Sequence, residues 1–255
     1  MMRAFTLAEA AVWLKAAEPA GAAEVTCQGV STDTRAIRDG DLFVALRGER
    51  FDGHEFVAQA KQAGAVAAVV DSAVAGADIP QLVVEDTVEA LAALAAAQRD
   101  ESRAQFVAVT GSSGKTTVRE MTGAILGNGG PVLVTQGNLN NHIGVPLTLF
   151  RLTPEHRFGV IELGASGVGE IAHTVAITRP DVAILTNAGQ AHLEGFGGYD
   201  KVVQAKGEII DAVAPTGVVV LNRDDPAFEI WRDRAGTRRV IAVSASGHPD
   251  ADYRY

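Results

Sequence analysis

Short apolar runs that alternate with helical patterns constrain the fold of this chain more than any other feature. Five runs are continuously apolar, as expected of strands buried on both faces of a sheet. They lie at 66–70, 106–109, 160–161, 182–185 and 218–221. Helical patterns flank and separate them, at 54–63, 87–99, 115–127, 168–178 and 199–213. This alternation predicts an α/β fold with a mainly parallel sheet.

A loop-like stretch at 76–80, which contains Gly76 and Pro80, divides the chain. We expect 1–85 to form a small N-terminal α/β domain and 86–255 to form a nucleotide-binding domain. The last apparent strand, 239–243, is followed by a short tail with no helical pattern. Because the last strand of a parallel sheet is normally covered by a helix, we expect the second domain to be incomplete and the chain to be shortened.

Charge and cysteine content exclude several classes of protein. A formal net charge of -9 argues against binding of nucleic acid or of an anionic membrane, although a local cationic pocket can still bind an anionic small molecule. Cys27 is the only cysteine, which excludes an intramolecular disulfide and a cysteine metal cluster. Near the N-terminus, Thr6 and Glu9 indicate a capping box of an amphipathic helix rather than a signal peptide. Since no uncharged apolar stretch is as long as a membrane span, we expect a cytoplasmic protein.

A glycine-rich loop between the strand ending at Thr110 and the helical pattern from Val118 predicts a phosphate-binding site. A loop of this kind directs backbone N–H groups and the positive end of a helix at an anion. Lys115 can reach the β- and γ-phosphates, and the Thr116 hydroxyl can bind Mg²⁺. The predicted phosphate-binding residues are Gly111, Ser112, Ser113, Gly114, Lys115, Thr116 and Thr117.

The spacing of this loop departs from the general phosphate-loop pattern, which has its first glycine where this chain has Val109. The alternative is a strand-to-helix turn with an incidental Gly-Lys-Thr sequence. The position of the loop between a strand and a helix favours phosphate binding.

Three residues further along the chain are candidates for chemistry beside the phosphates. Glu162 ends an apolar strand, where parallel sheets bind ligands, and its carboxylate can hold Mg²⁺; the alternative is an ordinary strand-end glutamate. His192 follows the strand 182–185, and a lone loop histidine is more often a surface residue. Lys201 and Lys206 lie on the helical pattern 199–213, and position alone leaves both on a solvated helix face.

Together these residues resemble the Mur ligase family of peptidoglycan biosynthesis. The short loop Thr110-Gly-Ser-Ser-Gly-Lys-Thr-Thr117 is that family's own variant of the phosphate loop, which accounts for its spacing. Further matching segments lie at 137–149, 161–164, 169–171, 191–196 and 205–209, and in the first domain at 31–35 and 42–54. The resemblance covers essentially the whole chain. Because family members continue into a C-terminal domain, we expect this chain to lack that domain.

The resemblance implies roles for the candidate residues. Glu162 matches a carboxylate that bridges two Mg²⁺ ions, Thr116 matches a ligand of the first ion, and His192 matches a ligand of the second. Lys206 matches a lysine that family members carry as an N-carbamate, an anionic oxygen donor suited to Mg²⁺. The expected metal ligands are thus Thr116, Glu162, His192 and Lys206. The expected catalytic residues are Lys115, Glu162, His192 and Lys206, and ATP and Mg²⁺ are the expected cofactors.

The resemblance also implies a reaction and its substrates. The expected activity joins D-alanyl-D-alanine to a UDP-N-acetylmuramoyl-tripeptide through an acyl phosphate made with ATP, and we expect a monomer. The first domain would bind the UDP part of the substrate. The candidate substrate-binding residues are Ser31, Asp33, Arg47 and His54, with Asn138 and Asn141 for the pyrophosphate–sugar part.

Two other hypotheses remain open. The shortened chain could bind the UDP-substrate and ATP without catalysis. It could also correspond to a related ligase that adds a different amino acid, although the string Asn138-Leu-Asn-Asn141 fits the D-alanyl-D-alanine-adding member better.

Overall fold

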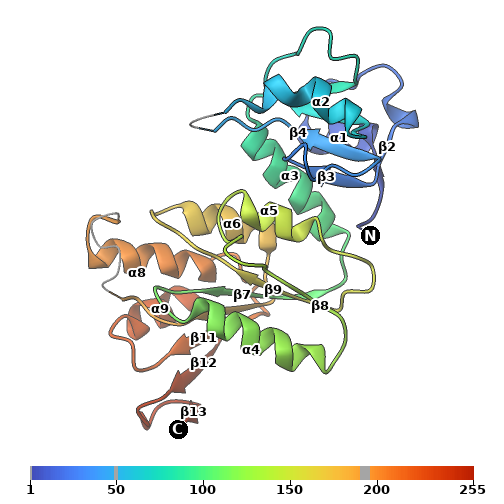
Figure 1. Ribbon diagram of the computed structural model, residues 1–255. Coiled ribbons are helices and arrows are strands. Elements are labelled where there is room, and N and C mark those ends of the chain that lie inside the picture. Colours follow the sequence, from blue (N-terminus) through green and yellow to red (C-terminus); the bar gives the residue numbers. More distant parts are fainter. Residues whose placement is uncertain (1, 49–50, 190–195) are drawn as a thin grey trace. The chain divides into compact units, whose positions relative to one another are not determined.

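The computed structural model describes residues 2–48, 51–189 and 196–255, and these form two compact units (Figure 1). Unit 1 contains the chain up to Ser102 together with Leu149–Pro154, and unit 2 contains the remainder. Helix α3 (Thr87–Asp100) packs against α1 (Leu7–Leu14) and belongs to unit 1. The division therefore follows Ser102 rather than residue 85, because the apolar face of α3 is part of the core of the first unit.

Unit 1 begins with the predicted capping box. The Thr6 Oγ1 accepts the Glu9 N–H at 3.1 Å, and the Glu9 carboxylate accepts the Thr6 N–H at 2.7 Å. This confirms the expected helix start, since two backbone donors without partners in the first turn are satisfied reciprocally. The short strands β1 (Phe5–Thr6) and β2 (Thr26–Cys27) pair antiparallel beside this helix.

The core of unit 1 is a four-stranded parallel sheet in the order β3-β4-β5-β6. Its strands are β3 (Gly29–Ser31), β4 (Asp41–Val44), β5 (Ala67–Val70) and β6 (Gln81–Val83). Every residue of β4 and β5 is buried, which explains why the sequence at β5 is a continuous apolar run. The other elements are η1 (Ala22–Glu24), η2 (Gly53–Phe56) and α2 (Val57–Gln62).

Unit 2 is built on a seven-stranded sheet in the order β13-β12-β11-β10-β7-β9-β8, and all of its strand pairs are parallel. The strands are β7 (Gln105–Thr110), β8 (Val132–Val134), β9 (Phe158–Glu162), β10 (Val182–Leu185), β11 (Val218–Asn222), β12 (Arg239–Ser244) and β13 (Tyr253–Arg254). The predicted α/β fold with a mainly parallel sheet is confirmed. The tail after β12 adds the short strand β13, so β12 is not the edge of this sheet.

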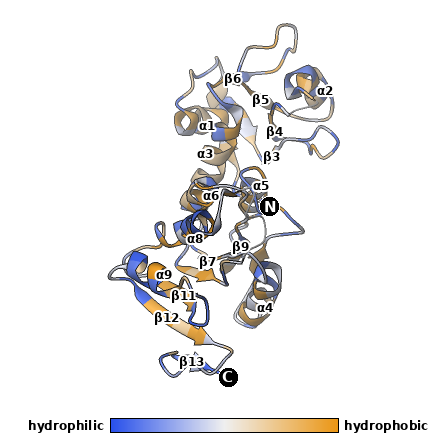
Figure 2. Cartoon of the chain, turned by 90° about the vertical axis from the view of Figure 1, so that its left-hand side faces the viewer, coloured by the Kyte–Doolittle hydropathy of each residue, from blue (hydrophilic) through white to orange (hydrophobic). Residues whose placement is uncertain are grey.

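Helices cover both faces of this sheet. Figure 1 shows α4 (Lys115–Gly127) below strands β7–β9 and α6 (Glu170–Thr178) above them. The remaining elements are α5 (Gly144–Leu149), α8 (Tyr199–Gly207), η3 (Glu208–Ile210) and α9 (Phe228–Ala235). The helix predicted at 199–213 is thus shorter than expected and continues as a 3₁₀ turn. Figure 2 shows the apolar character of the strands that lie between these helices.

Strand order fixes where a ligand can bind in unit 2. The chain passes from β7 to the edge strand β8, returns to β9 on one side of β7, and then crosses to β10 on the other side. In open parallel sheets, such a reversal leaves a crevice at the carboxyl ends of the strands. Thr110, Glu162 and Leu185 end the three strands that meet there.

Among the described residues, no helix is both long and apolar enough to cross a membrane.

Candidate active site

The predicted phosphate loop joins the carboxyl end of β7 to the first turn of α4. Gly111 has φ +148° and Gly114, the residue that precedes the helix, has φ +76°, conformations that favour glycine. A Cβ on Gly111 would lie 1.9 Å from the Thr186 Oγ1, so a larger residue does not fit there. No side chain caps the start of α4, and its first amide groups remain available for an anion.

Two residues that follow β10 hold the phosphate loop in place. The Asn187 side chain accepts the Ser113 N–H at 3.0 Å and donates to the Ser113 carbonyl at 3.1 Å. The Asn187 carbonyl accepts the Ser112 N–H at 2.9 Å, and the Thr186 hydroxyl donates to the Ser113 carbonyl at 2.6 Å. Sequence analysis missed both residues. Their position in the sequence could have indicated this role. Thr186 and Asn187 directly follow β10, and the carboxyl end of β10 lies at the same edge of the sheet as the start of the phosphate loop.

The charged and hydroxyl side chains of the loop lie close to its backbone. The Lys115 ammonium donates to the Gly111 carbonyl at 2.9 Å, which folds the side chain over the loop. Thr116 and Thr117 are both exposed, and Thr116 donates its hydroxyl to the Glu162 Oε2 at 3.0 Å. The structure therefore places the Thr116 hydroxyl beside the Glu162 carboxylate and the Lys115 ammonium over the loop backbone.

Glu162 is the last residue of β9 and only 2% exposed. Besides Thr116, its carboxylate accepts the Arg119 Nη1 on Oε2 at 3.0 Å and the Asn140 Nδ2 on Oε1 at 2.9 Å. The alternative of an exposed strand-end glutamate is wrong. Because a buried carboxylate is stable only when it is paired, these partners explain its position.

Sequence analysis missed Arg119 and Asn140. Arg119 is 3% exposed and lies three residues after Thr116, on the same face of α4. It also donates to the Gly137 carbonyl at 3.0 Å, so it joins the phosphate-loop helix to the asparagine-rich loop. The helical spacing from Thr116 was a usable signal for Arg119, but nothing local showed that it pairs with Glu162.

Lys206 lies on α8 and is only 3% exposed. Its Nζ donates to the Ala165 carbonyl at 3.5 Å and lies 5.3 Å from the centre of the Phe196 ring. Burial, aided by the nearby Lys115 ammonium and partly offset by the carboxylates of Glu170 and Glu208, lowers the pKa of Lys206 to about 8. The sequence pattern placed both lysines of this helix on a solvated face. This is correct for Lys201, which is exposed, and wrong for the buried Lys206.

The donor atoms of this site fit a magnesium ion in part. The Thr116 hydroxyl and the Glu162 carboxylate are adjacent hard oxygen donors, and Mg²⁺ commonly takes its other ligands from phosphate oxygens and water. Within 2–48, 51–189 and 196–255, no cluster of three or more His, Cys, Asp or Glu side chains could hold a metal. His192, the predicted ligand of the second ion, lies outside the described residues.

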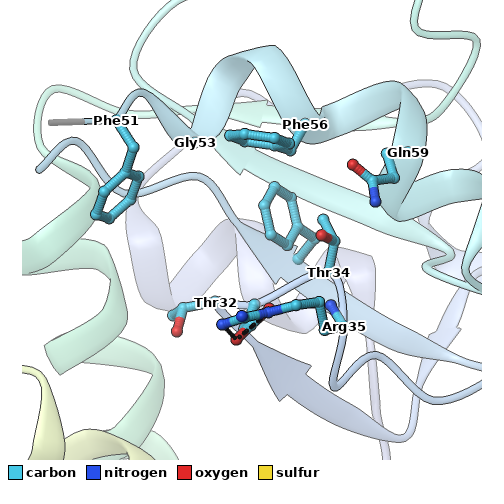
Figure 3. A pocket seen from close by; sticks show the side chains of 9 residues that line it. Thr32, Thr34, Arg35, Phe51, Gly53, Phe56 and Gln59 are labelled. Carbon is cyan, nitrogen blue, oxygen red and sulfur yellow. Dashed lines mark hydrogen bonds and ion pairs between the residues drawn. The ribbon is translucent and has the colours of Figure 1, made fainter.

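Unit 1 contains a separate pocket of about 460 Å³ (Figure 3). Figure 3 shows Phe51 and Phe56 on one side of it and Thr32 and Arg35 on the other. Its lining residues are Thr32, Asp33, Thr34, Arg35, Phe43, Phe51, Gly53, Phe56 and Gln59. Hydrogen bonds from Arg35 lower the pKa of Asp33 to about 2, so this carboxylate is ionised at neutral pH.

The other candidate substrate residues of unit 1 do not line this pocket. Arg47 forms two hydrogen bonds to Asp71, at 2.6 and 2.8 Å, and pairs with Asp52. The buried ring of His54 lies 2.6 Å from Asp52 and accepts the Asp71 N–H at 3.0 Å. Through Asp71, both residues thus connect the segment that follows β4 to the end of β5. Ser31 is buried and its hydroxyl bonds to the Asp33 backbone.

The two candidate asparagines lie in different environments. Asn138 is exposed. The Asn141 Oδ1 accepts the N–H groups of Ile143 and Gly144 at 3.2 and 2.8 Å, which begins α5. Its local role is therefore that of a helix cap.

Comparison with known families decides the assignment. Residues 109–254 match the Mur ligase middle domain, and residues 26–99 match the catalytic domain described for the Mur ligase family. The chain belongs to the Mur ligase family. The two Mur ligase matches lie on either side of Ser102, in agreement with the division of the structure into units.

Individual Mur ligases are similar along most of this chain. The UDP-N-acetylmuramoyl-tripeptide--D-alanyl-D-alanine ligase of Escherichia coli (strain K12) is 52% identical over 222 residues, which are 87% of this chain and 49% of that protein. The crystal structure of MurF from Acinetobacter baumannii superposes with a TM-score of 0.88 at 39% identity, covering 95% of this chain and 54% of that one.

A third relative contains a nucleotide. The crystal structure of MurF ligase from Thermotoga maritima in complex with ADP has a TM-score of 0.78 at 36% identity, with 85% of this chain and 50% of that one covered. The chain thus spans about half the length of the Mur ligases that it matches.

Proposed function

We propose that this chain provides the nucleotide- and substrate-binding units of an ATP-dependent ligase that joins D-alanyl-D-alanine to UDP-N-acetylmuramoyl-tripeptide. One observation carries the proposal: Thr116 of the phosphate loop and the buried carboxylate of Glu162 lie 3.0 Å apart at the carboxyl ends of parallel strands. The identity of 52% to an Escherichia coli ligase named for this reaction supports the choice of substrates.

The proposed reaction overcomes the poor reactivity of a carboxylate. The terminal carboxylate of the tripeptide attacks the γ-phosphorus of ATP, and ADP leaves, which gives an acyl phosphate. The free amine of D-alanyl-D-alanine then attacks the acyl carbon, phosphate leaves with the bonding electrons, and the nitrogen loses a proton as the amide forms. Lys115, together with backbone N–H groups of the phosphate loop, neutralises charge that develops on the transferred phosphoryl group.

Thr116 and Glu162 are the residues that would hold the magnesium ion beside the phosphates. When bound, Mg²⁺ would neutralise phosphate charge and orient the phosphoryl group for transfer. The hydrogen bonds from Arg119 and Asn140 aim the Glu162 carboxylate before any metal binds. A second ion held by His192 and Lys206 remains a proposal that rests on the family resemblance.

Lys206 is proposed to carry an N-carbamate. Carbamylation requires a neutral amine, and a pKa of about 8 leaves a larger neutral fraction at physiological pH than the ordinary value of 10.5 does. We predict that Lys206→Ala abolishes turnover, measured as phosphate release, and that added bicarbonate does not restore it. Full activity of the Lys206→Ala variant would refute the carbamate assignment.

The pocket of unit 1 is proposed to bind the UDP part of the substrate. Aromatic rings stack on bases, and Phe51 and Phe56 offer such faces at the pocket. Asp33 is the sequence candidate that lines this pocket, with Thr32 and Gln59 as additional polar groups. Ser31, Arg47 and His54 are proposed to support the surrounding loops, and Asn138 stays a candidate for the pyrophosphate–sugar part.

Phosphate release tests the proposal directly. The chain is mixed with ATP, Mg²⁺, UDP-N-acetylmuramoyl-tripeptide and D-alanyl-D-alanine, and release that requires all components supports the ligase. Product mass with other amino acids or dipeptides in place of D-alanyl-D-alanine distinguishes related ligases.

A second candidate function is a binding module without catalysis, for which the pocket of unit 1 and the phosphate loop of unit 2 would suffice. Absence of phosphate release with intact binding of the UDP-substrate would establish it and reject catalysis by this chain.

A further inference from the structure

Glu208 is a buried carboxylate to which neither the sequence nor the family resemblance gives a role. It is 5% exposed and begins the 3₁₀ turn η3, directly after α8. Its Oε1 accepts the Gly169 N–H at 2.8 Å, and its Oε2 accepts the Ala172 N–H at 3.0 Å. Both donors belong to the start of α6, so Glu208 joins two segments that are distant in sequence.

The two hydrogen bonds make Glu208 the cap of α6. Gly169 precedes this helix with φ +95° and has no side chain to cap it. In an ordinary capping box, the first residue and the residue three positions later satisfy each other's N–H groups. Here one carboxylate from a distant element accepts both of these N–H groups. Its negative charge also lies at the positive end of the helix, which strengthens the interaction.

The capped helix start lies at the end of a loop that contacts Lys206. This loop, 163–169, connects Glu162 at the end of β9 to α6, and its Ala165 carbonyl accepts from the Lys206 Nζ. Lys206 is two residues before Glu208. The Glu208 carboxylate therefore fixes, at the same time, the segment that carries the lysine and the loop that the lysine contacts.

We propose that Glu208 is a positioning residue that holds the Lys206 amine beside the 163–169 loop, next to the phosphate site. The inference rests on the proposed role of Lys206 in the ligase reaction. Substitution of Glu208 frees the first turn of α6 and the end of α8 from each other, and the Lys206 amine loses its fixed, buried position.

The competing explanation is that Glu208 acts on Lys206 only through its negative charge and does not position it. Glu170 provides a matched control for this explanation. Glu170 and Glu208 both act electrostatically on Lys206. Glu170 accepts the Ser166 N–H at 2.9 Å and makes no bond across to α8 or η3 among the described contacts. Glu170→Gln and Glu208→Gln each remove one negative charge near the lysine, but only Glu208→Gln breaks the cap, because an amide cannot accept from two N–H groups with both of its ends.

The test measures the chemical accessibility of the Lys206 amine in this chain without ATP or substrate. Cyanate adds to neutral amines, and the modified fraction at each lysine is read by peptide mass spectrometry. The exposed Lys201, on the same helix, is the internal reference. The rate of each lysine is measured as a function of pH up to about pH 11, and the limiting rate of the neutral amine reports exposure rather than titration.

We expect Glu208→Gln to raise the modification rate of Lys206 relative to Lys201 by roughly threefold or more, through local opening, and Glu170→Gln to change it less than about twofold. A wild-type rate in Glu208→Gln, or an equal increase in Glu170→Gln, would overturn the proposal.

If Glu208→Gln fails to fold by circular dichroism, Glu208→Asp is used, because its shorter carboxylate keeps the charge but cannot reach both N–H groups. A folded Glu208→Asp variant with the wild-type rate would also overturn the proposal. Since labelling involves no catalysis, its outcome is independent of whether the ligase assay succeeds.

Discussion

At the scale of single residues, the buried pair of Arg119 and Glu162 connects three parts of the candidate site. Arg119 comes from the phosphate-loop helix, Glu162 from β9, and the Gly137 carbonyl that also accepts from Arg119 comes from the asparagine-rich loop. A buried pair adds little net stability relative to apolar residues, but the loss of one partner leaves an uncompensated charge. The pair therefore fixes geometry more than it adds to the free energy of unfolding.

We predict that Arg119→Met lowers the free energy of unfolding by about 3–5 kcal/mol, because it leaves the Glu162 carboxylate buried without its cation. Urea unfolding of the isolated variant measures the loss. The double variant Arg119→Met/Glu162→Gln removes both charges and is expected to recover much of the lost stability. A loss as large in the double variant as in the single one would contradict the charge explanation.

Lys206 gives a prediction with a defined pH window. Its pKa is about 8 in the folded protein against an ordinary value of 10.5, so the unfolded chain binds more protons between these two values. Stability of the wild type therefore rises with pH from about 8 to about 10.5, and the burial penalty is fully present below pH 8. We predict that Lys206→Met is more stable than the wild type at pH 7, by up to about 3 kcal/mol.

This advantage of Lys206→Met is expected to disappear as the pH rises through 10.5. Urea unfolding at a series of pH values measures it, in buffers free of CO₂ so that the wild-type amine is not carbamylated. A difference between the two proteins that does not change with pH would show that packing, rather than protonation, is responsible.

At the scale of elements, the phosphate loop depends on its neighbour after β10 as much as on its own sequence. Gly111 approaches the Thr186 hydroxyl so closely that a Cβ has no space, and Asn187 bonds to the next two residues of the loop. Such a loop is held in its binding conformation before the ligand arrives. Because the loop loses little conformational freedom when the ligand binds, more of the interaction energy contributes to affinity.

We predict that Gly111→Ala weakens binding of ADP with Mg²⁺ by more than about tenfold, because both its φ of +148° and the contact with Thr186 force the loop to move. Isothermal titration measures the affinity. Gly127→Ala is the matched control, since a Cβ at the last residue of α4 meets no atom within 4 Å. It is expected to bind ADP normally and to gain at most about 1 kcal/mol of stability from helix propensity. Equal affinities for the two variants would rule out the proposed loop geometry.

At the scale of the whole molecule, the chain consists of two units that each have a parallel sheet and a buried core. Each unit also contains its own candidate ligand site, the pocket of unit 1 and the phosphate loop of unit 2. A ligand that binds a folded unit stabilises it by about 2.7 kcal/mol at a concentration one hundred times its Kd. Binding should therefore protect the two units separately.

We predict that UDP slows hydrogen exchange at Thr32–Arg35 and Gly53–Gln59, whereas ADP with Mg²⁺ slows it at Gly111–Thr117 and in the first turns of α4. Hydrogen exchange read by mass spectrometry measures both effects on the same samples, with uridine as a control that lacks phosphates. Protection of the phosphate loop by UDP alone, with none around the pocket of unit 1, would contradict the assignment of the two sites.

The amino-acid sequence by itself determined the α/β class, the capping box of α1, the place of the phosphate loop and the position of Glu162 at a strand end. These features depend on apolar periodicity and on residues close together in the chain, which a local pattern records. The resemblance to the Mur ligase family singled out Lys206, whereas its position on the helical pattern alone predicts an exposed residue.

Only the tertiary structure decided which side chains meet. Arg119 and Glu162 are 43 residues apart in sequence, and Ser113 and Asn187 are 74 apart. It also showed that Arg47 and His54 bond to Asp52 and Asp71 rather than line the pocket, and that α3 belongs to unit 1. The physical reason is the same in each case: burial, and the partner that makes burial tolerable for a polar group, are set by strand order and helix packing, which bring distant segments together.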